Sequence, residues 1–215
     1  IYVDATKGWL STAAAKASDI SEQETFITAT GGTITECGDY KIHTFTGPGT
    51  FCVSSIGNPN GGPNSVDYLV VAGGAGGAGR TGSGGGAGGF RESSGATTGC
   101  YTASPLGSGV SALPVTAQGY PITVGSGGGG SPGGGCLACS GNPSTFLSIT
   151  SSGGGGGHTS AGGPGGSGGG GGRLSPNTAG NGNTPPVSPP QGNNGGSGSP
   201  AYQAGGGGGA TATGT

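Results

Sequence analysis

Residues 73–89 read GGAGGAGRTGSGGGAGG, and this stretch constrains the fold more than any other. Glycine recurs there at every third position, at Gly73, Gly76, Gly79, Gly82, Gly85 and Gly88. A three-residue repeat is typical of an extended polyproline-II-type helix, which has no internal hydrogen bonds and rises about 3.1 Å per residue. Because glycine has no side chain to bury, the run is either a flexible linker or one rod in a bundle whose backbone groups bond sideways to other rods.

The rest of the chain favours a bundle of rods. A second glycine run covers residues 125–135 and keeps the same spacing at Gly127, Gly130 and Gly133, and further runs cover 153–172 and 192–209. Short apolar segments that read as strands precede the first three runs, at 66–71, 120–124 and 145–150. The sequence therefore predicts a unit of strand, glycine rod and loop that occurs three times. Rods of 11 to 20 residues would span roughly 35 to 60 Å.

Residues 31–66 carry the clearest β-pattern. Alternating β-branched and aromatic residues at 33–37, 40–45 and 50–54 are separated by short glycine turns, which predicts a three-stranded antiparallel meander. His43 lies within one of these strands, and we expect it to face solvent. The predicted fold class is all-β and irregular with almost no α-helix: an N-terminal assembly segment at 1–30, a small meander at 31–66 and a polyglycine-II bundle at 67–215, with loops at 90–119, 136–144 and 173–191.

Composition narrows the possible partners. Glycine makes up 60 of 215 residues, only 7% are charged, and the net charge is -2, which is typical of neither an ordinary globular domain nor a charge-rich disordered chain. All eight acidic residues lie at or before Glu92, and Arg173 is the only charged residue after it. The chain has no basic stripe for nucleic acid and no apolar run of about 20 residues for a membrane span. We therefore predict neither nucleic-acid binding nor membrane insertion.

The five cysteines leave several pairings open. Cys37 and Cys52 flank two predicted strands, and we predict that they form a disulfide. Cys100, Cys136 and Cys139 would then form a second disulfide with one thiol to spare, or would bind a metal together with His158. We favour the disulfide and predict neither a metal nor a cofactor. A disulfide framework is typical of an extracellular protein.

The sequence argues against an enzyme. Glycoside hydrolysis needs a pair of carboxylates in one groove, yet the acidic residues are confined to the first 92 residues. Nucleophilic catalysis needs a base beside the nucleophile, and Cys136 or Cys139 with His158 is the only candidate. No acidic residue follows His158 to orient it. We therefore predict no catalytic residues.

Two stretches resemble a known family. Residues 31–54, GGTITECGDYKIHTFTGPGTFCVS, and 67–91, DYLVVAGGAGGAGRTGSGGGAGGFR, are similar to the glycine-rich domain of tail-fibre proteins of tailed phages, marine ones in particular. The architecture resembles the polyglycine-II adhesins of some T-even-like phages, whose loops contact the host outer membrane. The resemblance implies an extracellular virion domain that binds a host cell-surface receptor through its loops. The implied contact residues are Phe90, Arg91, Tyr101 and Arg173.

Two other functions stay open. The chain begins at Ile1 without methionine, and its residues 1–3 read as a strand, so a secreted and processed subunit could assemble into an extracellular filament by strand addition to the next copy. The near-absence of charge from 93 to 215 does nothing to oppose such packing of a homo-oligomer. Ice binding is the third function, because small residues recur in one register as a flat face at Ala75, Ala78, Thr81 and Ala87.

Overall fold

The structure is a computed structural model that describes residues 23–95, 102, 104–107, 109–131, 137–199, 201 and 203–215. Most of the predicted N-terminal assembly segment, together with Cys100, Tyr101, Gly133 and Cys136, lies outside the described residues. The described residues form short strands and two 3-10 turns and no α-helix, which confirms the all-β prediction for this part of the chain. The elements are β1 (Thr28–Thr30), β2 (Thr33–Cys37), β3 (Tyr40–Thr44), β4 (Gly49–Ser55), η2 (Pro59–Gly61), β5 (Ser65–Val66), β6 (Leu69–Val71), β7 (Phe90–Glu92), η3 (Pro105–Gly107), β8 (Leu113–Pro114), β9 (Gly119–Thr123), β10 (Ser144–Phe146) and β11 (Ile149–Ser151).

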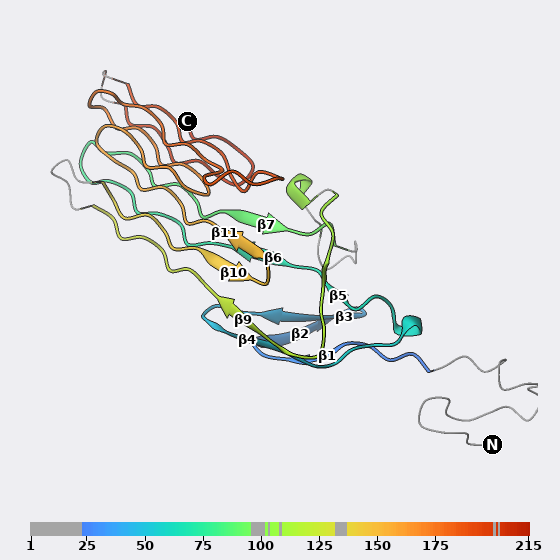
Figure 1. The fold of residues 1–215 in the computed structure, drawn as a ribbon. Helices are drawn as coiled ribbons and strands as arrows, with labels where there is room; N and C mark the ends of the chain where they lie inside the picture. The colour runs from blue at the N-terminus through green and yellow to red at the C-terminus, as the bar shows by residue number, and fades with distance from the viewer. Residues whose placement is uncertain are drawn as a thin grey trace, which may run out of the picture.

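The strands form one larger sheet and three separate pairs (Figure 1). The antiparallel five-stranded sheet has the order β1-β4-β9-β10-β11, and the pairs are β2 with β3, β5 with β8 and β6 with β7. The predicted three-stranded meander is therefore wrong, because β4 pairs with β1 and β9 and not with β3. Gly31 and Gly32, with φ of 108° and 66°, turn the chain between β1 and β2, so that the β2–β3 hairpin forms its own ribbon.

A small apolar core holds these strands together. Phe51 of β4 contacts Phe146 edge-on at 6.0 Å and lies 6.4 Å from Tyr120, and the buried cluster comprises Phe51, Val53, Tyr68, Val70, Val115, Tyr120, Phe146 and Ile149. In β6 only Val70 is buried, while Leu69 and Val71 are about half exposed. This alternation follows from the two-residue period of a strand, which directs successive side chains to opposite faces.

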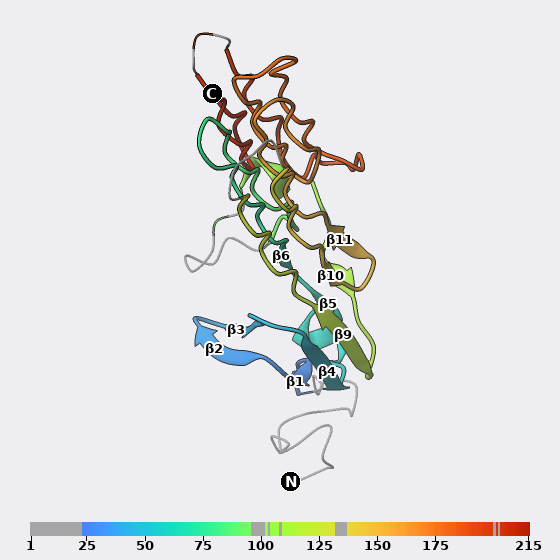
Figure 2. The ribbon, with the colours of Figure 1, turned by 90° about the vertical axis from the view of Figure 1, so that its left-hand side faces the viewer.

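Beyond the strands, the chain builds a bundle of extended segments that run side by side (Figures 1 and 2). We call these the bundle segments: residues 72–79, 83–89, 125–131, 137–143, 152–158, 161–165, 166–172, 177–183, 193–198 and 205–209. Residues three apart in a segment commonly bond to the same neighbour, and the neighbour can change where a segment ends. The N–H groups of Ala72, Ala75 and Ala78 donate to the carbonyls of Gly89, Gly86 and Ser83, and those of Gly73, Gly76 and Gly79 donate to Asn142, Cys139 and Ser131.

A single bundle segment has neighbours on several sides and in both directions. Segment 83–89 exchanges backbone hydrogen bonds with 72–79, 152–158, 166–172 and 205–209. It runs antiparallel to the first three, whereas Gly84 and Ala87 donate to Gly205 and Gly208 of a segment that runs parallel to it. Both orientations therefore occur in one bundle.

The bundle segments are shorter than the predicted rods, because the chain folds back within each long glycine run. The run 73–89 turns at residues 79–82, where the Gly82 N–H donates to the Gly79 carbonyl at 3.1 Å. The run 153–172 bends near 158–161 and again near 165–167, and in the run 192–209 Ser199 pairs antiparallel with Gln203. A chain that turns back supplies hydrogen-bond partners to its own backbone, which a single straight rod cannot do. Segments of five to eight residues span roughly 15 to 25 Å.

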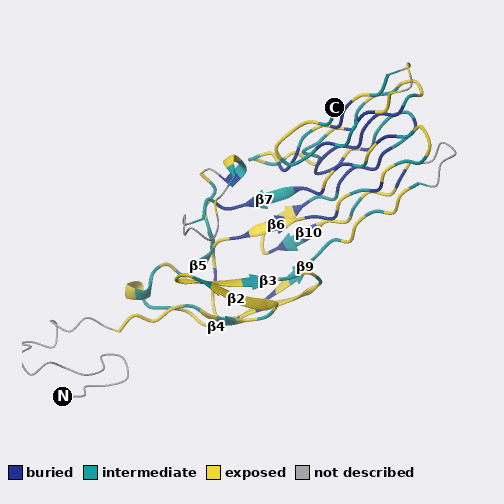
Figure 3. Ribbon diagram, turned by 180° about the vertical axis from the view of Figure 1, so that it is seen from behind, coloured by how far each residue is buried: buried dark blue, intermediate teal, exposed yellow. Residues whose placement is uncertain are grey.

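Backbone, and not side chains, fills the centre of the bundle. Residues 154–157 and 165–172 are buried (Figure 3). A Cβ atom added at Gly154 would overlap the Gly86 carbonyl oxygen, and one added at Gly156 would overlap that of Ala138. Only glycine permits so close an approach of two backbones.

Two local predictions are wrong. The apolar run 145–150 is not one strand but the hairpin of β10 and β11, which turns at Leu147 with a φ of 52°. His43 does not simply face solvent: its ring is half-buried, contacts Phe51 edge-on at 5.0 Å and lies with Nδ1 2.8 Å from the Gly31 carbonyl oxygen. Within the described residues, we find no helix with the length and apolarity that a membrane crossing requires.

Candidate functional site

Three turns meet at one end of the bundle, which we call the far end: residues 79–82, 158–161 and 173–176. Segments 72–79 and 152–158 continue directly from β6 and β11, so these turns lie at the end opposite the strands (Figure 1). Hydrogen bonds join them. The Ser83 N–H donates to the His158 carbonyl at 3.2 Å, the Leu174 N–H to Thr159 at 2.8 Å, and the Gly172 N–H to Ser160 at 2.7 Å.

Ser83, a buried residue next to the turn 79–82, holds the turns of the far end in place. Its side chain is 3% exposed. The hydroxyl accepts a hydrogen bond from the His158 N–H at 2.9 Å, lies 3.0 Å from the His158 carbonyl and contacts the Gly170 carbonyl. Because buried hydroxyls that are fully bonded hold their surroundings in one geometry, Ser83 ties three bundle segments together just below the turns.

The far end also carries the charge of the bundle. In residues 72–89 and 93–215 the only charged side chains are Arg80 and Arg173. Arg80 is exposed in the turn 79–82 and has a φ of 58°, whereas Arg173 is half-buried next to Leu174. His158 belongs to the turn 158–161, and its Nδ1 accepts from the Ser160 N–H at 3.2 Å.

The structure separates the predicted contact residues. Phe90 and Arg91 lie in β7, and the Phe90 N–H donates to the Gln191 carbonyl at 2.8 Å. Arg173 lies at the far end, so the length of segment 152–158, roughly 20 Å, separates it from them. Tyr101 lies outside the described residues. Sequence reasoning missed Arg80, whose one signal was a single charge inside a glycine repeat.

The predicted loops also differ from the structure. Residues 137–143 of the predicted loop 136–144 and residues 177–183 of the predicted loop 173–191 are bundle segments. In the predicted loop 90–119, the buried carboxylate of Glu92 accepts the Ser104 N–H at 2.8 Å, which ties Ser104 to β7. Burial raises the pKa of the neighbouring Tyr68 phenol above its ordinary value, and the charge of Arg91 partly offsets this rise.

Gln191 joins the loop 184–190 to the strand end of the bundle. Its side chain is fully buried, with Oε1 accepting from the Ser152 N–H at 2.7 Å and Nε2 donating to the Pro185 carbonyl at 3.0 Å. Its backbone N–H donates to Asn183 Oδ1 at 3.2 Å. The side chain therefore joins this proline-rich loop to the residue after β11, while the backbone carbonyl of Gln191 bonds to β7.

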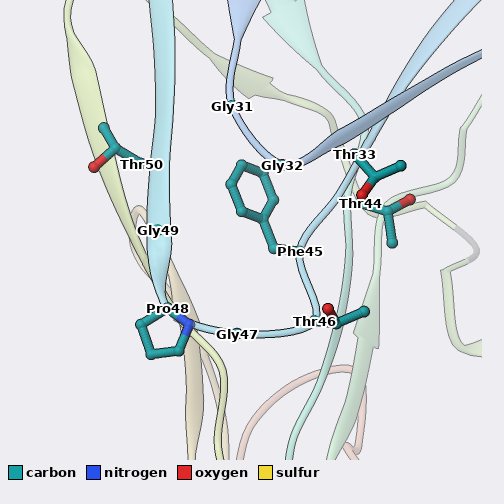
Figure 4. A pocket seen from close by; sticks show the side chains of 10 residues that line it. All are labelled: Gly31, Gly32, Thr33, Thr44, Phe45, Thr46, Gly47, Pro48, Gly49 and Thr50. Atoms are coloured by element: carbon teal, nitrogen blue, oxygen red, sulfur yellow. The ribbon is translucent and has the colours of Figure 1, made fainter.

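A shallow, open pocket of about 350 Å³ lies at the base of the β2–β3 hairpin (Figure 4). The ring of Phe45 lies among the backbones of Gly31, Gly32 and Gly49, where an added Cβ would come within 3.3 Å of it or closer. Threonines and glycines make up most of the remaining lining. No lining residue titrates near neutral pH, so the lining residues themselves supply no acid–base chemistry.

The rod glycines differ in the space around them. A Cβ at Gly73, Gly76, Gly82, Gly85 or Gly88 would overlap a neighbouring segment or turn. In the second run the crowded positions are Gly125 and Gly128, while Gly127 has room for a Cβ and a Cβ at Gly130 would lie 3.3 Å from the Gly77 carbonyl oxygen. Ala75 and Ala78, half of the small-residue face expected for ice binding, are half-buried and bonded to segment 83–89.

The cysteine pairing differs from the prediction. Cys52 and Cys139 are free, exposed thiols, so the predicted Cys37–Cys52 disulfide is wrong. Cys52 lies on the exposed face of β4, with the buried side chains of Phe51 and Val53 on the other face. Cys100 and Cys136 lie outside the described residues. Within the described part of the chain, no three His, Cys, Asp or Glu side chains gather as a metal site would require.

Comparison with known proteins identifies the family. A family model described as a glycine-rich domain matches residues 46–215, and the chain belongs to this family. The match covers the five-stranded sheet from β4 onward and the whole bundle. Neither the curated proteins nor the solved structures contain a match.

Proposed function

We propose that this chain is a non-enzymatic structural and receptor-binding domain of a phage tail fibre, and that its bundle segments are polyglycine-II helices forming a rigid scaffold. The observation that carries the proposal is the placement of both bundle charges at the far end, on turns fixed by backbone hydrogen bonds. Recognition residues commonly occupy turns on a rigid scaffold. The resemblance of residues 31–54 and 67–91 to phage tail-fibre domains supports the same function.

The polyglycine-II assignment rests on the bonding pattern of the bundle. N–H groups three residues apart donate to the same neighbouring segment, as at Ala72, Ala75 and Ala78. A three-fold extended helix directs its backbone groups sideways with this period. A β-strand, with a period of two, bonds only to neighbours in one sheet.

A self-assembling extracellular filament is the second candidate. It is favoured by β1, which is an edge strand of the five-stranded sheet and forms the end of the predicted N-terminal segment 1–30. An edge strand presents unpaired backbone groups to which another chain can add. Phe26, two residues before β1, is 63% exposed and would become covered in such a contact.

Electron microscopy and cell binding together separate these functions. We expect the purified 215-residue chain to form discrete particles, and the fluorescently labelled chain to bind intact cells of some strains in a panel of marine bacteria. Regular filaments longer than one molecule, lost when the first 22 residues are removed, would favour the filament. Discrete particles that bind no strain of a broad panel would contradict the receptor-binding function.

A further inference from the structure

We infer that the far end is a binding site for an anionic surface glycan, whose phosphate or carboxylate groups are taken by Arg80 and Arg173. The inference deepens the proposed function and rests on it, since it assigns the ligand class of the displayed surface. Both arginines belong to turns that are joined through Ser83, His158 and Thr159.

The charge distribution is the first argument. No acidic side chain occurs in residues 72–89 or 93–215, and the chain as a whole is negative, with a net charge of -2. The positive charge of the bundle is thus concentrated at one end, while the acidic residues lie in the N-terminal part and in β7. An anionic ligand approaching the far end meets no carboxylate side chain of the bundle itself.

The backbone of Arg80 is the second argument. Its φ of 58° lies in the left-handed region, which is unfavourable for a residue other than glycine. The turn lies in a glycine repeat, and 60 of the 215 residues of the chain are glycine, so glycine is the residue expected there. An arginine in this conformation is favoured for its side chain and not for its backbone, and such strain clusters at functional positions.

The chemistry of arginine sets the class of ligand. A guanidinium presents five N–H donors in a planar fork that matches phosphate and carboxylate, so it can bind a ligand while keeping a partner within the protein. Two cations are too few for the nucleic-acid backbone, which proteins bind by neutralising many phosphates. A repeating anionic glycan suits them better, because many copies of a weak site on one fibre give strong overall attachment.

The test compares binding to three immobilised polymers: polyphosphate, polygalacturonate and neutral dextran. We expect the intact chain to bind one or both anionic polymers, more weakly as salt increases, and not to bind dextran. Arg80→Gln and Arg173→Gln should each weaken the binding about tenfold. Retention on one anionic polymer alone supports the inference and identifies the group as phosphate or carboxylate.

Lys41→Gln is the matched control. It removes one positive charge from the exposed β2–β3 hairpin, where Lys41 lies 3.7 Å from Glu36, and it should leave polymer binding unchanged. Equal losses in Lys41→Gln and Arg80→Gln would overturn the inference, because binding would then follow net charge. Unaltered melting temperatures show that the variants are folded.

Cell binding separates this inference from the proposed function. If the intact chain binds cells and Arg80→Gln binds them equally well, the anionic-glycan site is wrong while receptor binding stands. If the chain binds the anionic polymers but no cells, the site exists and the host-binding function fails. If it binds no anionic polymer at all, the inference is wrong.

Discussion

Two neighbouring glycines of bundle segment 125–131 differ in whether there is space for a side chain. A Cβ at Gly128 would overlap the Cys139 carbonyl oxygen, whereas one at Gly129 would meet nothing within 4 Å. We expect Gly128→Ala to lower the free energy of unfolding by about 1–3 kcal/mol through overpacking. We expect Gly129→Ala to raise it by about 0.4–1 kcal/mol, because alanine restricts the unfolded chain. Chemical denaturation of both variants measures the two changes.

Opposite signs at adjacent positions are the critical result. Equal effects of Gly128→Ala and Gly129→Ala would show that segment 125–131 does not pack as described. Gly76→Val and Ala78→Ser give a second comparison in the first run: the valine should prevent folding, because Gly76 faces the Gly129 backbone, and the serine should be tolerated.

The sequence shows that glycine recurs at every third position, but it does not show which of the three positions is the crowded one. The three-residue spacing is visible from Gly73 to Gly88, and those positions with a described environment are crowded. In the second run the same spacing points to Gly127 and Gly130, yet Gly125 and Gly128 are the crowded positions. Where almost every residue is glycine, only the placement of the neighbouring segments decides which positions require glycine.

At the scale of elements, the β10–β11 turn contains a residue that fits its conformation poorly. Leu147 has a φ of 52° and a side chain that is 39% exposed. Asparagine tolerates this region better, so Leu147→Asn should stabilise the fold by about 0.5–1 kcal/mol. Leu147→Val should destabilise it, since β-branched residues disfavour positive φ. Thermal unfolding measures both, and a less stable asparagine variant would contradict the turn geometry.

The docking of the loop 184–190 should depend on Gln191. Gln191→Ala removes the acceptor for the Ser152 N–H and the donor to the Pro185 carbonyl, and it leaves a cavity. We expect a loss of about 2–4 kcal/mol in the free energy of unfolding, with faster amide exchange at Ser152. Gln203→Ala, at an exposed position, is the control and should change little. Comparable losses in both variants would exclude this anchoring role for Gln191.

The strands illustrate what a sequence alone predicts about elements. Runs of β-branched and aromatic residues bounded by glycine turns located β2, β3, β4 and β9 correctly, because this composition is a local pattern. Their pairing was not predictable, since β4 pairs with a strand some 70 residues later through Phe51 and Tyr120. The β10–β11 hairpin was missed because Leu147 gives no glycine or asparagine turn signal.

At the scale of the whole molecule, the bundle and the sheet should unfold together. Segments 72–79 and 152–158 continue directly from β6 and β11, so the apolar core and the backbone network share their strands. We expect the amides of Gly155 and Gly169, which donate inside the bundle, to show protection against hydrogen exchange similar to that of Val53 in the sheet. Exchange in the bundle that is faster by orders of magnitude would show two independent units.

The candidate site was only partly predictable at this scale. Arg173 was identified because it is the only charged residue after Glu92. Its association with Arg80 depends on the turns at 79–82 and 158–161, which fold two long glycine runs back on themselves. No residue pattern in a run of glycines marks where the run will turn. The sequence therefore did not indicate that Arg80 and Arg173, 93 positions apart, lie at the same end of the bundle.

Segment 83–89, with four neighbours around it, has a consequence for how such proteins change over evolution. A β-sheet grows only along one line, at its two edges. In the bundle a segment can have neighbours on all sides, so the bundle can grow in any lateral direction by the addition of one further glycine hairpin. Gene duplications within the glycine runs would therefore enlarge the far end turn by turn, without requiring a new hydrophobic core.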